Sequence, residues 1–339
     1  MKEIGNRRSA FADWKFWIGI SVSAVFLWLS LRNADFREVA QAFRTANYWW
    51  VIPSVAANLM GLVVRSFRWR FLLKPIRLIR MRDLFSSTMI GFMGNNLFPA
   101  RLGELLRAYV LGIKTGVSKT ASFATIILER MFDGMTVLSM LAVVVVFFDL
   151  PFSPMVRKAS MASAALYLAL LFLMIAMKVR TTRVMRMFET LFSPFPSKIR
   201  IRIMRGLHSF VDGLDMLRDA KSIVISLALS ALLWMCPAFA IYFILLATGI
   251  HLPVYAAFFL LVILCIGVAV PSAPGFLGTI QYVSVIGLAL FGVSKSLALS
   301  FSVLYHVSQW APVTAIGLVF FFTQGFSFSR IGEGGENKE

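Results

Sequence analysis

Six charged residues lie close together in two neighbouring segments that are otherwise largely apolar. Glu104 and Arg107 are three residues apart, and Glu129 and Asp133 are four apart, so each pair shares one helical face. An arginine at a helix start, as expected for Arg101, combines its guanidinium with unpaired backbone N–H groups, which suits an anion and phosphate in particular. The six residues are Arg101, Glu104, Arg107, Glu129, Arg130 and Asp133. We expect Arg101 and Arg107 to meet a phosphate, with the acids orienting them.

The elements that carry these charges are apolar enough to face lipid. Of 339 residues, 59% are hydrophobic and 15% are charged, which excludes a water-soluble globule. Runs long enough to cross about 30 Å of hydrocarbon lie at 16–31, 48–67, 120–148, 160–177, 222–247 and 296–323. The first run also resembles the start of a signal peptide, but it lacks a small-residue cleavage site, so we interpret it as a retained span. The sequence predicts an all-α polytopic transmembrane helix bundle.

The basic residues predict the orientation of this bundle. Placing the arginine-rich segments 65–82 and 178–221 inside puts 25 of the 34 basic residues in the cytoplasm, together with both termini. We therefore expect a cytoplasmic segment 1–15, a single transmembrane domain 16–323 and a cytoplasmic tail 324–339. The net charge of +18 is explained by this distribution, so no nucleic-acid partner is expected. An amphipathic helix within 178–221 is expected on the inner interface of a bacterial cytoplasmic (inner) membrane.

Two further apolar stretches, 85–112 and 254–292, are interrupted by residues that a continuous span would not contain. In the first, Pro99 predicts that one helix stops near Asn95 and that a second starts near Pro99. In the second, the breaking residues are Pro271, Pro274, Gly275 and Gly278. Their flanking charges predict two re-entrant helical hairpins that enter from opposite sides. This is the pattern of an inverted repeat, with a binding site where the broken tips meet.

These patterns together predict a set of substrate-binding residues. His306 lies in the last span, where it is either a packing residue or a contact for ligand or protons. The charged residues have an alternative role too, in which they only pair with one another and tie two helices together. His208, His251 and His306 are scattered, so we expect neither a metal nor a cofactor. The predicted site residues are Asn95, Asn96, Arg101, Glu104, Arg107, Glu129, Arg130, Asp133, Pro274, Gly275, Gly278, Gln281 and His306.

Three of these motifs also carry a family resemblance. Asn95-Asn96-Leu-Phe-Pro99-Ala-Arg101-Leu-Gly103-Glu104-Leu-Leu-Arg107, Glu129-Arg130-Met-Phe-Asp133 and Pro271-Ser-Ala-Pro274-Gly275-Phe-Leu-Gly278 resemble, in this order, the lysylphosphatidylglycerol synthase transmembrane-region family. The resemblance covers the chain from about Phe16 to Phe322 and implies a flippase-like role in moving lipids or lipid-linked glycans. Gln281 stands where the family often has an acid. No aminoacyl-transferring domain is evident, so the resemblance does not imply the synthase reaction.

We therefore expect a transporter of anionic lipids or of lipid-linked, polyprenyl-phosphate intermediates. Its expected partners are membrane lipids with anionic headgroups, and enzymes of lipid biosynthesis are candidate partners. An alternative is a membrane glycosyl- or acyl-transferase acting on a lipid, with Glu104, Glu129 or His306 as general base, although no donor site is evident. A scaffold that recruits partners through its basic inner surface is a third reading.

Overall fold

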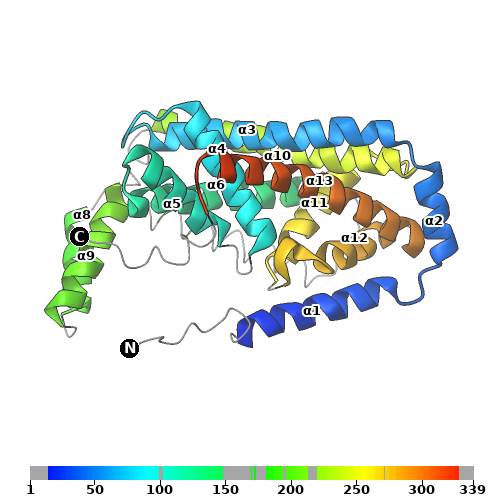
Figure 1. Cartoon of the computed structure of the whole chain (residues 1–339), viewed down its shortest axis with the longest axis horizontal. Helices are drawn as coiled ribbons and strands as arrows, with labels where there is room; N and C mark the ends of the chain where they lie inside the picture. Colours follow the sequence, from blue (N-terminus) through cyan, green and yellow to red (C-terminus); the bar gives the residue numbers. More distant parts are fainter. Residues whose placement is uncertain are drawn as a thin grey trace. The chain divides into compact units, whose positions relative to one another are not determined.

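The computed structural model describes residues 14–98, 102–147, 181–193, 196–212, 220–270 and 272–327, together with residues 169 and 172. All regular structure in these residues is helical, as predicted, and no strand occurs among them (Figure 1). The helices are α1 (Trp14–Leu31), α2 (Phe36–Thr45), η2 (Tyr48–Trp50), α3 (Val51–Leu73), α4 (Met81–Leu97), α5 (Gly103–Thr115), α6 (Lys119–Phe147), α8 (Thr181–Leu191), α9 (Ser197–Asp212), α10 (Ala220–Ala247), α11 (Val254–Val268), η5 (Pro274–Phe276), α12 (Thr279–Ala289) and α13 (Lys295–Thr323).

Three of the described helical stretches are long and apolar enough to cross a membrane. They are Tyr48–Leu73, Lys221–Ala247 and Lys295–Thr323. Trp17–Leu31 and Phe36–Thr45 meet the same criteria only as a pair, and the chain bends by 85° between them. The predicted run 120–148 is the single helix α6, which carries charged residues in its middle, and the run 160–177 lies outside the described residues.

The first interrupted stretch forms two helices, α4 and α5, as predicted. α4 continues to Leu97, past the expected stop near Asn95, because a proline at 99 disfavours the helical conformation directly only for the residue before it, Phe98. α5 begins at Gly103, so the expected start near Pro99 is wrong by four residues. The two helices pack closely at glycines, since a Cβ on Gly94 would lie 3.0 Å from Cα of Gly103.

The second interrupted stretch also forms two helices, α11 and α12, which pack against each other. Their bounds match the predicted limbs 254–270 and 279–292 to within three residues. Between them lie η5 and two glycines in the left-handed region, Gly275 with φ 70° and Gly278 with φ 81°. Side chains rarely adopt these angles, so the glycines permit the break.

The segment predicted to hold an amphipathic interfacial helix contains two helices, α8 and α9. They lie side by side (Figure 1) and share a small apolar core around Met185 and Val211. α9 ends at Asp212. Residues 213–219 of the predicted segment lie outside the described part of the chain.

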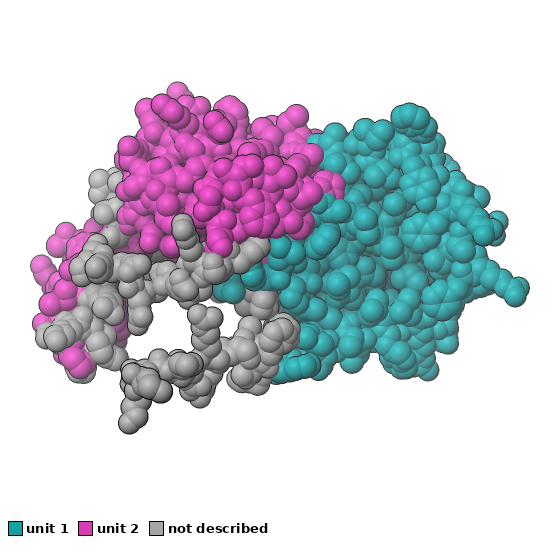
Figure 2. Space-filling model, viewed as in Figure 1, with its two compact units in different colours: residues 1–56, 95–102, 238–311 teal, residues 57–94, 103–237, 312–339 magenta. Residues whose placement is uncertain are grey.

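The chain divides into two compact units (Figure 2), which are described separately below. Unit 1 comprises residues 1–56, 95–102 and 238–311, and unit 2 comprises residues 57–94, 103–237 and 312–339. Four of the boundaries fall within α3, α4, α10 and α13, and a fifth falls just before α5; two of them coincide with the helix-internal prolines Pro237 and Pro312.

In unit 1, α1 packs against α12 and against the break that precedes it. The Ser23 hydroxyl accepts a 2.7 Å hydrogen bond from the Ala273 N–H, and Phe26 stacks on Tyr282 with ring centroids 4.7 Å apart. A Cβ on Gly278 would lie only 2.3 Å from the Ser23 main-chain oxygen. The approach of α1 therefore requires a glycine at 278.

In unit 2, α5 packs on α6, and both contribute to the largest apolar core of the unit. Gly91 brings α4 against α5, because a Cβ there would lie 2.8 Å from Cβ of Arg107. The buried core residues are Trp69, Leu72, Leu73, Ile79, Leu84, Ala108, Leu111, Val117, Ile126, Leu128, Met131 and Phe132. The charged residues described next lie beside this core, on the same helices.

Candidate functional site

A cluster of ion pairs lies inside unit 2, between α3, α5, α6 and α10. Its seven charged members, which we call the ion cluster, are Arg65, Arg68, Glu104, Arg107, Glu129, Arg130 and Asp133. Five of them are at most 5% exposed, and Glu104 and Arg130 are partly exposed. Charges buried to this degree must be paired or must bind a ligand, because an isolated buried ion is strongly destabilising.

Asp133 is the most heavily contacted acid of the ion cluster. Its Oδ2 lies 2.8 Å from Nη1 of Arg65 and 3.3 Å from Nη2 of Arg130. Its Oδ1 accepts hydrogen bonds from Nη1 of Arg68 at 2.7 Å and from Nε1 of Trp234 at 3.1 Å. Both carboxylate oxygens are thus held by donors from three helices, α3, α6 and α10.

Glu129, one helical turn earlier on α6, joins the remaining buried arginines. Its Oε2 accepts a 2.6 Å bond from Nη1 of Arg107, and its Oε1 accepts a 3.2 Å bond from Nη2 of Arg68. Arg68 also donates to the hydroxyl of Ser230 on α10. Both terminal nitrogens of Arg68 are therefore engaged.

Arg107 differs from Arg68 in that a tryptophan covers one face of its guanidinium. Its Cζ lies 3.7 Å from the centroid of the Trp69 ring, a stacked cation–π contact. Trp69 is held in turn by a 2.9 Å bond from its Nε1 to the Thr125 hydroxyl, which donates to the carbonyl of Ser122. The Nε and Nη2 atoms of Arg107 are buried and have no hydrogen-bond partner among the described residues.

The ion cluster has an excess of positive charge. Among the described residues, the three buried guanidinium groups of Arg65, Arg68 and Arg107 face the two buried carboxylates of Glu129 and Asp133, which leaves one positive charge in the buried part. Glu104 takes part through Arg130, whose Nε lies 3.6 Å away. A set of charges that existed only to tie helices together would be most stable when balanced, so the excess favours an anionic ligand.

The acids of the ion cluster were predicted from the sequence, but two of its arginines were not. Arg65 and Arg68 were counted in a cytoplasmic loop, and the structure places them inside α3 with exposures of 5% and 0%. Two features of the sequence could have indicated that these arginines lie within a helix. They are three residues apart, which places them on one helical face, and the apolar residues Phe71, Leu72 and Leu73 continue the helix beyond them. Ser230 and Trp234 gave no comparable signal.

The predicted residues of α5 and of the preceding break are placed only in part. Pro99 and Arg101 lie outside the described residues, so the prediction for Arg101 stays a prediction. Arg107 is buried. Leu102 and Leu105 are exposed, whereas Leu106 is buried.

The predicted residues of the second break come together in unit 1. Gln281 caps α12 by accepting a 2.8 Å bond from the Gly278 N–H through Oε1, and its Nε2 lies 3.0 Å from Nδ1 of His306. Because Oε1 is already an acceptor there, Nε2 is the donor and Nδ1 of His306 accepts. The backbone of Gly275 is a further hydrogen-bonding neighbour of His306.

Unit 1 also brings the two breaks into contact. A Cβ on Gly275 would lie 3.2 Å from the main-chain oxygen of Asn96 and 2.9 Å from Nε1 of Trp310. The Asn96 side chain in turn donates a 3.5 Å bond to the Trp310 carbonyl. Asn95, next to it, has a buried Oδ1. Pro274 is the first residue of η5, beside Gly275.

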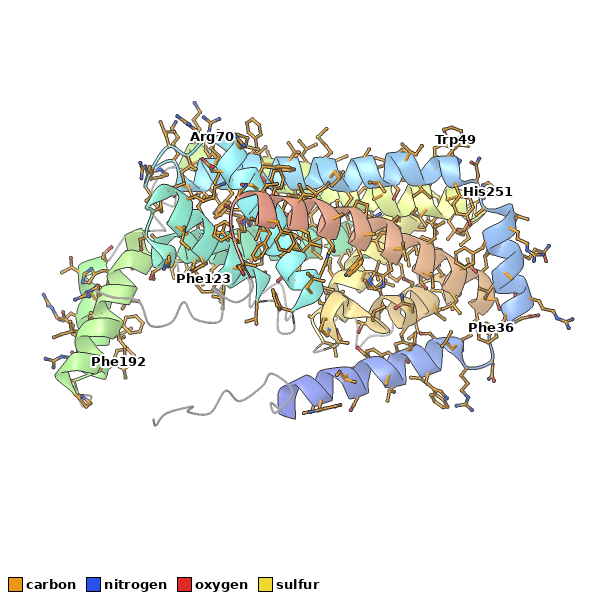
Figure 3. The ribbon with its side chains drawn as sticks, viewed as in Figure 1. Phe36, Trp49, Arg70, Phe123, Phe192 and His251 are labelled. Carbon is orange, nitrogen blue, oxygen red and sulfur yellow. The ribbon has the colours of Figure 1, made fainter. Side chains whose placement is uncertain are left out.

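The geometry of the ion cluster can bind and orient an anion. Figure 3 shows how densely side chains fill the region between the helices, with Arg70 of α3 labelled at its edge. Arg70 is exposed, unlike its neighbours Arg68 and Trp69. Arg70 is therefore an ordinary surface arginine on α3, next to the buried residues of the ion cluster on the same helix.

Comparisons with known proteins agree with this helical, membrane-embedded architecture. The family model described as lysylphosphatidylglycerol synthase TM region matches residues 16–317. A UPF0104 membrane protein of Methanothermobacter thermautotrophicus is 26% identical over 299 residues, which cover 83% of this chain and 87% of the relative. The UPF0104 membrane protein MJ1078 of Methanocaldococcus jannaschii is 25% identical over 232 residues, covering 67% and 92% of the two chains.

Another relative is named for an enzymatic activity. A protein of Haloferax volcanii called Glycosyltransferase AglD is 24% identical over 331 residues. The match covers 88% of this chain and 52% of that relative, which is therefore the longer protein.

Proposed function

The chain belongs to the lysylphosphatidylglycerol synthase transmembrane-region family and is a multi-pass membrane protein, and from this premise we propose that it moves anionic lipids across the membrane. The cargo is a phosphate-bearing lipid or a lipid-linked, polyprenyl-phosphate intermediate. Its headgroup phosphate binds at the ion cluster, and its acyl or prenyl chains stay in the lipid.

The observation that carries this proposal is the buried excess of arginine. Arg65, Arg68 and Arg107 are at most 5% exposed and face two buried carboxylates, Glu129 and Asp133, so the buried part of the ion cluster holds one more cation than anions among the described residues. An anion that enters the ion cluster balances this charge. The neighbouring acids keep binding from becoming too tight, since part of each guanidinium is already neutralised, and a transported headgroup must also leave.

The second break contributes to the same proposal. We assign α4–α5 and α11–α12 to two re-entrant hairpins of opposite sense in an inverted repeat. The contact of Gly275 with Asn96 supports this assignment, because the tips of such hairpins meet. In unit 1 the proposed substrate-binding residues are Asn95, Asn96, Arg101, Pro274, Gly275, Gly278, Gln281 and His306.

We also propose a membrane and an orientation for the chain. The distribution of basic residues favours a cytoplasmic membrane with both termini inside, segments 1–15 and 324–339 in the cytoplasm, and the amphipathic helices α8 and α9 on the inner interface. Lipids with anionic headgroups are the proposed ligands, and enzymes that make them are candidate partners.

The test is translocation in proteoliposomes. Fluorescent phosphatidylglycerol and fluorescent phosphatidylcholine are placed in the inner leaflet, and their appearance outside is followed by chemical quenching. Vesicles with the protein should move the anionic probe faster than empty vesicles, and R107A should abolish the difference. R70A, which removes an exposed arginine on α3, is the matched control and should behave as wild type. Equal rates for wild type, R107A and empty vesicles contradict the proposal.

A membrane enzyme acting on a lipid is the second candidate, favoured by the relative called Glycosyltransferase AglD. In that case Glu104, Glu129 or His306 serves as general base. Mass spectrometry of lipids from a deletion strain separates the two functions. Accumulation of an unflipped precursor supports transport, whereas loss of a modified lipid supports the enzyme. If neutralising the ion cluster changes neither, a scaffold role gains support.

A further inference from the structure

The arginines of the ion cluster are not equivalent in the hydrogen bonds that they can still donate. Arg68 uses both terminal nitrogens, toward Asp133, Ser230 and Glu129. Arg65 donates to Asp133 through Nη1, and only its Nε is buried without a partner among the described residues. Arg107 is the buried arginine for which Nε and a terminal nitrogen, Nη2, both lack such a partner there.

These two atoms of Arg107 form one edge of the guanidinium. The N–H bonds of Nε and Nη2 point to the same side and are nearly parallel, so they fit two oxygens of one phosphate. The opposite terminal nitrogen, Nη1, is occupied by Glu129 at 2.6 Å. Because Arg107 is only 2% exposed, bulk water does not satisfy the free edge, and leaving it unmatched is unfavourable.

Trp69 fixes the plane of this guanidinium. It covers one face at 3.7 Å and leaves the edges open, because stacking uses the face of the ion and hydrogen bonds lie in its plane. Its own ring is fixed by the bond from Nε1 to Thr125. Trp69 and Glu129 together therefore determine the direction of the Nε and Nη2 edge.

On the basis of the proposed function, we infer that the Nε and Nη2 edge of Arg107 is the group that binds the phosphate, and that Trp69 is its positioning residue. The ligand accepts two parallel hydrogen bonds through two terminal phosphate oxygens. Arg68, with both terminal nitrogens engaged, holds Glu129 and Asp133 in place. The phosphate belongs to a lipid headgroup or is free inorganic phosphate, and the experiment distinguishes these sources.

The inference is tested by ligand binding to purified protein in detergent, with native mass spectrometry as the readout. One arm titrates phosphatidylglycerol and the other titrates inorganic phosphate. The variant R107K keeps one cation beside Glu129 and removes the two-donor edge, so the ligand that wild type binds should bind about 10- to 100-fold more weakly. R70K makes the same change at an exposed position of α3 and should bind as wild type (Figure 3).

A double-mutant cycle tests the role assigned to Trp69. W69F keeps a ring and removes the bond to Thr125, so binding should weaken about 3- to 10-fold, and T125V should have a similar effect. Because Trp69 acts through Arg107, W69F should cause no further loss in the R107K background. If the losses of binding affinity from W69F and from R107K instead multiply in the double mutant, Trp69 has a merely structural role and its assignment as a positioning residue is wrong.

The outcomes separate the inference from the proposed function. Binding of phosphatidylglycerol but not inorganic phosphate, lost in R107K, supports a lipid headgroup as the ligand, and the converse supports free phosphate. If wild type binds neither, the proposed function fails. If wild type binds and R107K binds equally well, the inference fails while the proposed function stands. If R107K does not give monodisperse protein, the variants W69F and T125V replace it in the test. Unchanged ligand binding in both of them then overturns the inference.

Discussion

Gly275 lies directly against Asn96, so that a Cβ on Gly275 would be 3.2 Å from the Asn96 main-chain oxygen. These residues belong to two interrupted apolar stretches that are far apart in the sequence: Asn96 lies in the last turn of α4, and Gly275 lies in η5. The close approach and the positive φ of Gly275 require glycine at this position. This requirement leads to the first prediction.

Replacing Gly278 by alanine should destabilise the protein far more than replacing Gly249. Both glycines have positive φ, 81° and 72°, but a Cβ at 278 would lie 2.3 Å from the Ser23 oxygen, whereas nothing lies within 4 Å at 249. We expect about 1–2 kcal/mol for G249A from backbone strain and at least about 2 kcal/mol more for G278A from the clash. Unfolding titrations in mixed micelles measure both, and equal losses would contradict the packing of α1.

Asp133→Asn should be strongly destabilising. The change leaves Arg65 without its carboxylate and Arg68 with Glu129 alone, while both arginines stay buried, and breaking such a buried pair costs about 3–5 kcal/mol. Asp83→Asn is the matched control, because its pair with Lys114 is partly exposed and is worth about 0–1 kcal/mol. The same titrations measure the free energy of unfolding. Similar effects of the two changes would show that Asp133 does not hold the arginines.

Gln281→Met should weaken the turn before α12. The change removes the acceptor of the buried Gly278 N–H and the donor to His306, and an unmatched buried amide costs about 1–3 kcal/mol. Gln41→Met on the exposed surface of α2 is the control and should be close to neutral. Hydrogen exchange of the Gly278 amide, followed by mass spectrometry, should rise in Q281M alone. Unchanged exchange would argue against the capping role.

The helical class and the two interrupted segments could be predicted from the sequence because their causes are local. Proline and glycine within apolar stretches predicted both breaks, and the bounds of α11 and α12 agree closely with the prediction. The four-residue spacing of Glu129 and Asp133 likewise predicted that both acids face one partner. The start of α5 was predicted too early, because the packing of Gly103 against Gly94 depends on a contact between helices.

The partners of these acids could not be predicted in the same way. Arg65 and Arg68 lie at the end of an apolar run, where arginine is usually a cytoplasmic flank, and only tertiary packing distinguishes a flank from a buried ion pair. The stacking of Trp69 on Arg107 joins α3 to α5 and has no local signature. The acids of the ion cluster could therefore be predicted from their spacing in the sequence, whereas Arg65, Arg68 and Trp69 could be assigned to it only from the three-dimensional structure.

The most direct test of the account asks where the phosphate of a bound lipid lies. A photoreactive phosphatidylglycerol with a diazirine beside the phosphate is bound to the purified protein, and the crosslinked peptides are identified by mass spectrometry. The account predicts crosslinks to the peptides around Trp69, Arg107 and Glu129, lost in R107A and retained in R70A. Crosslinks confined to exposed positions such as Leu102 and Leu105, and unchanged in R107A, would contradict it.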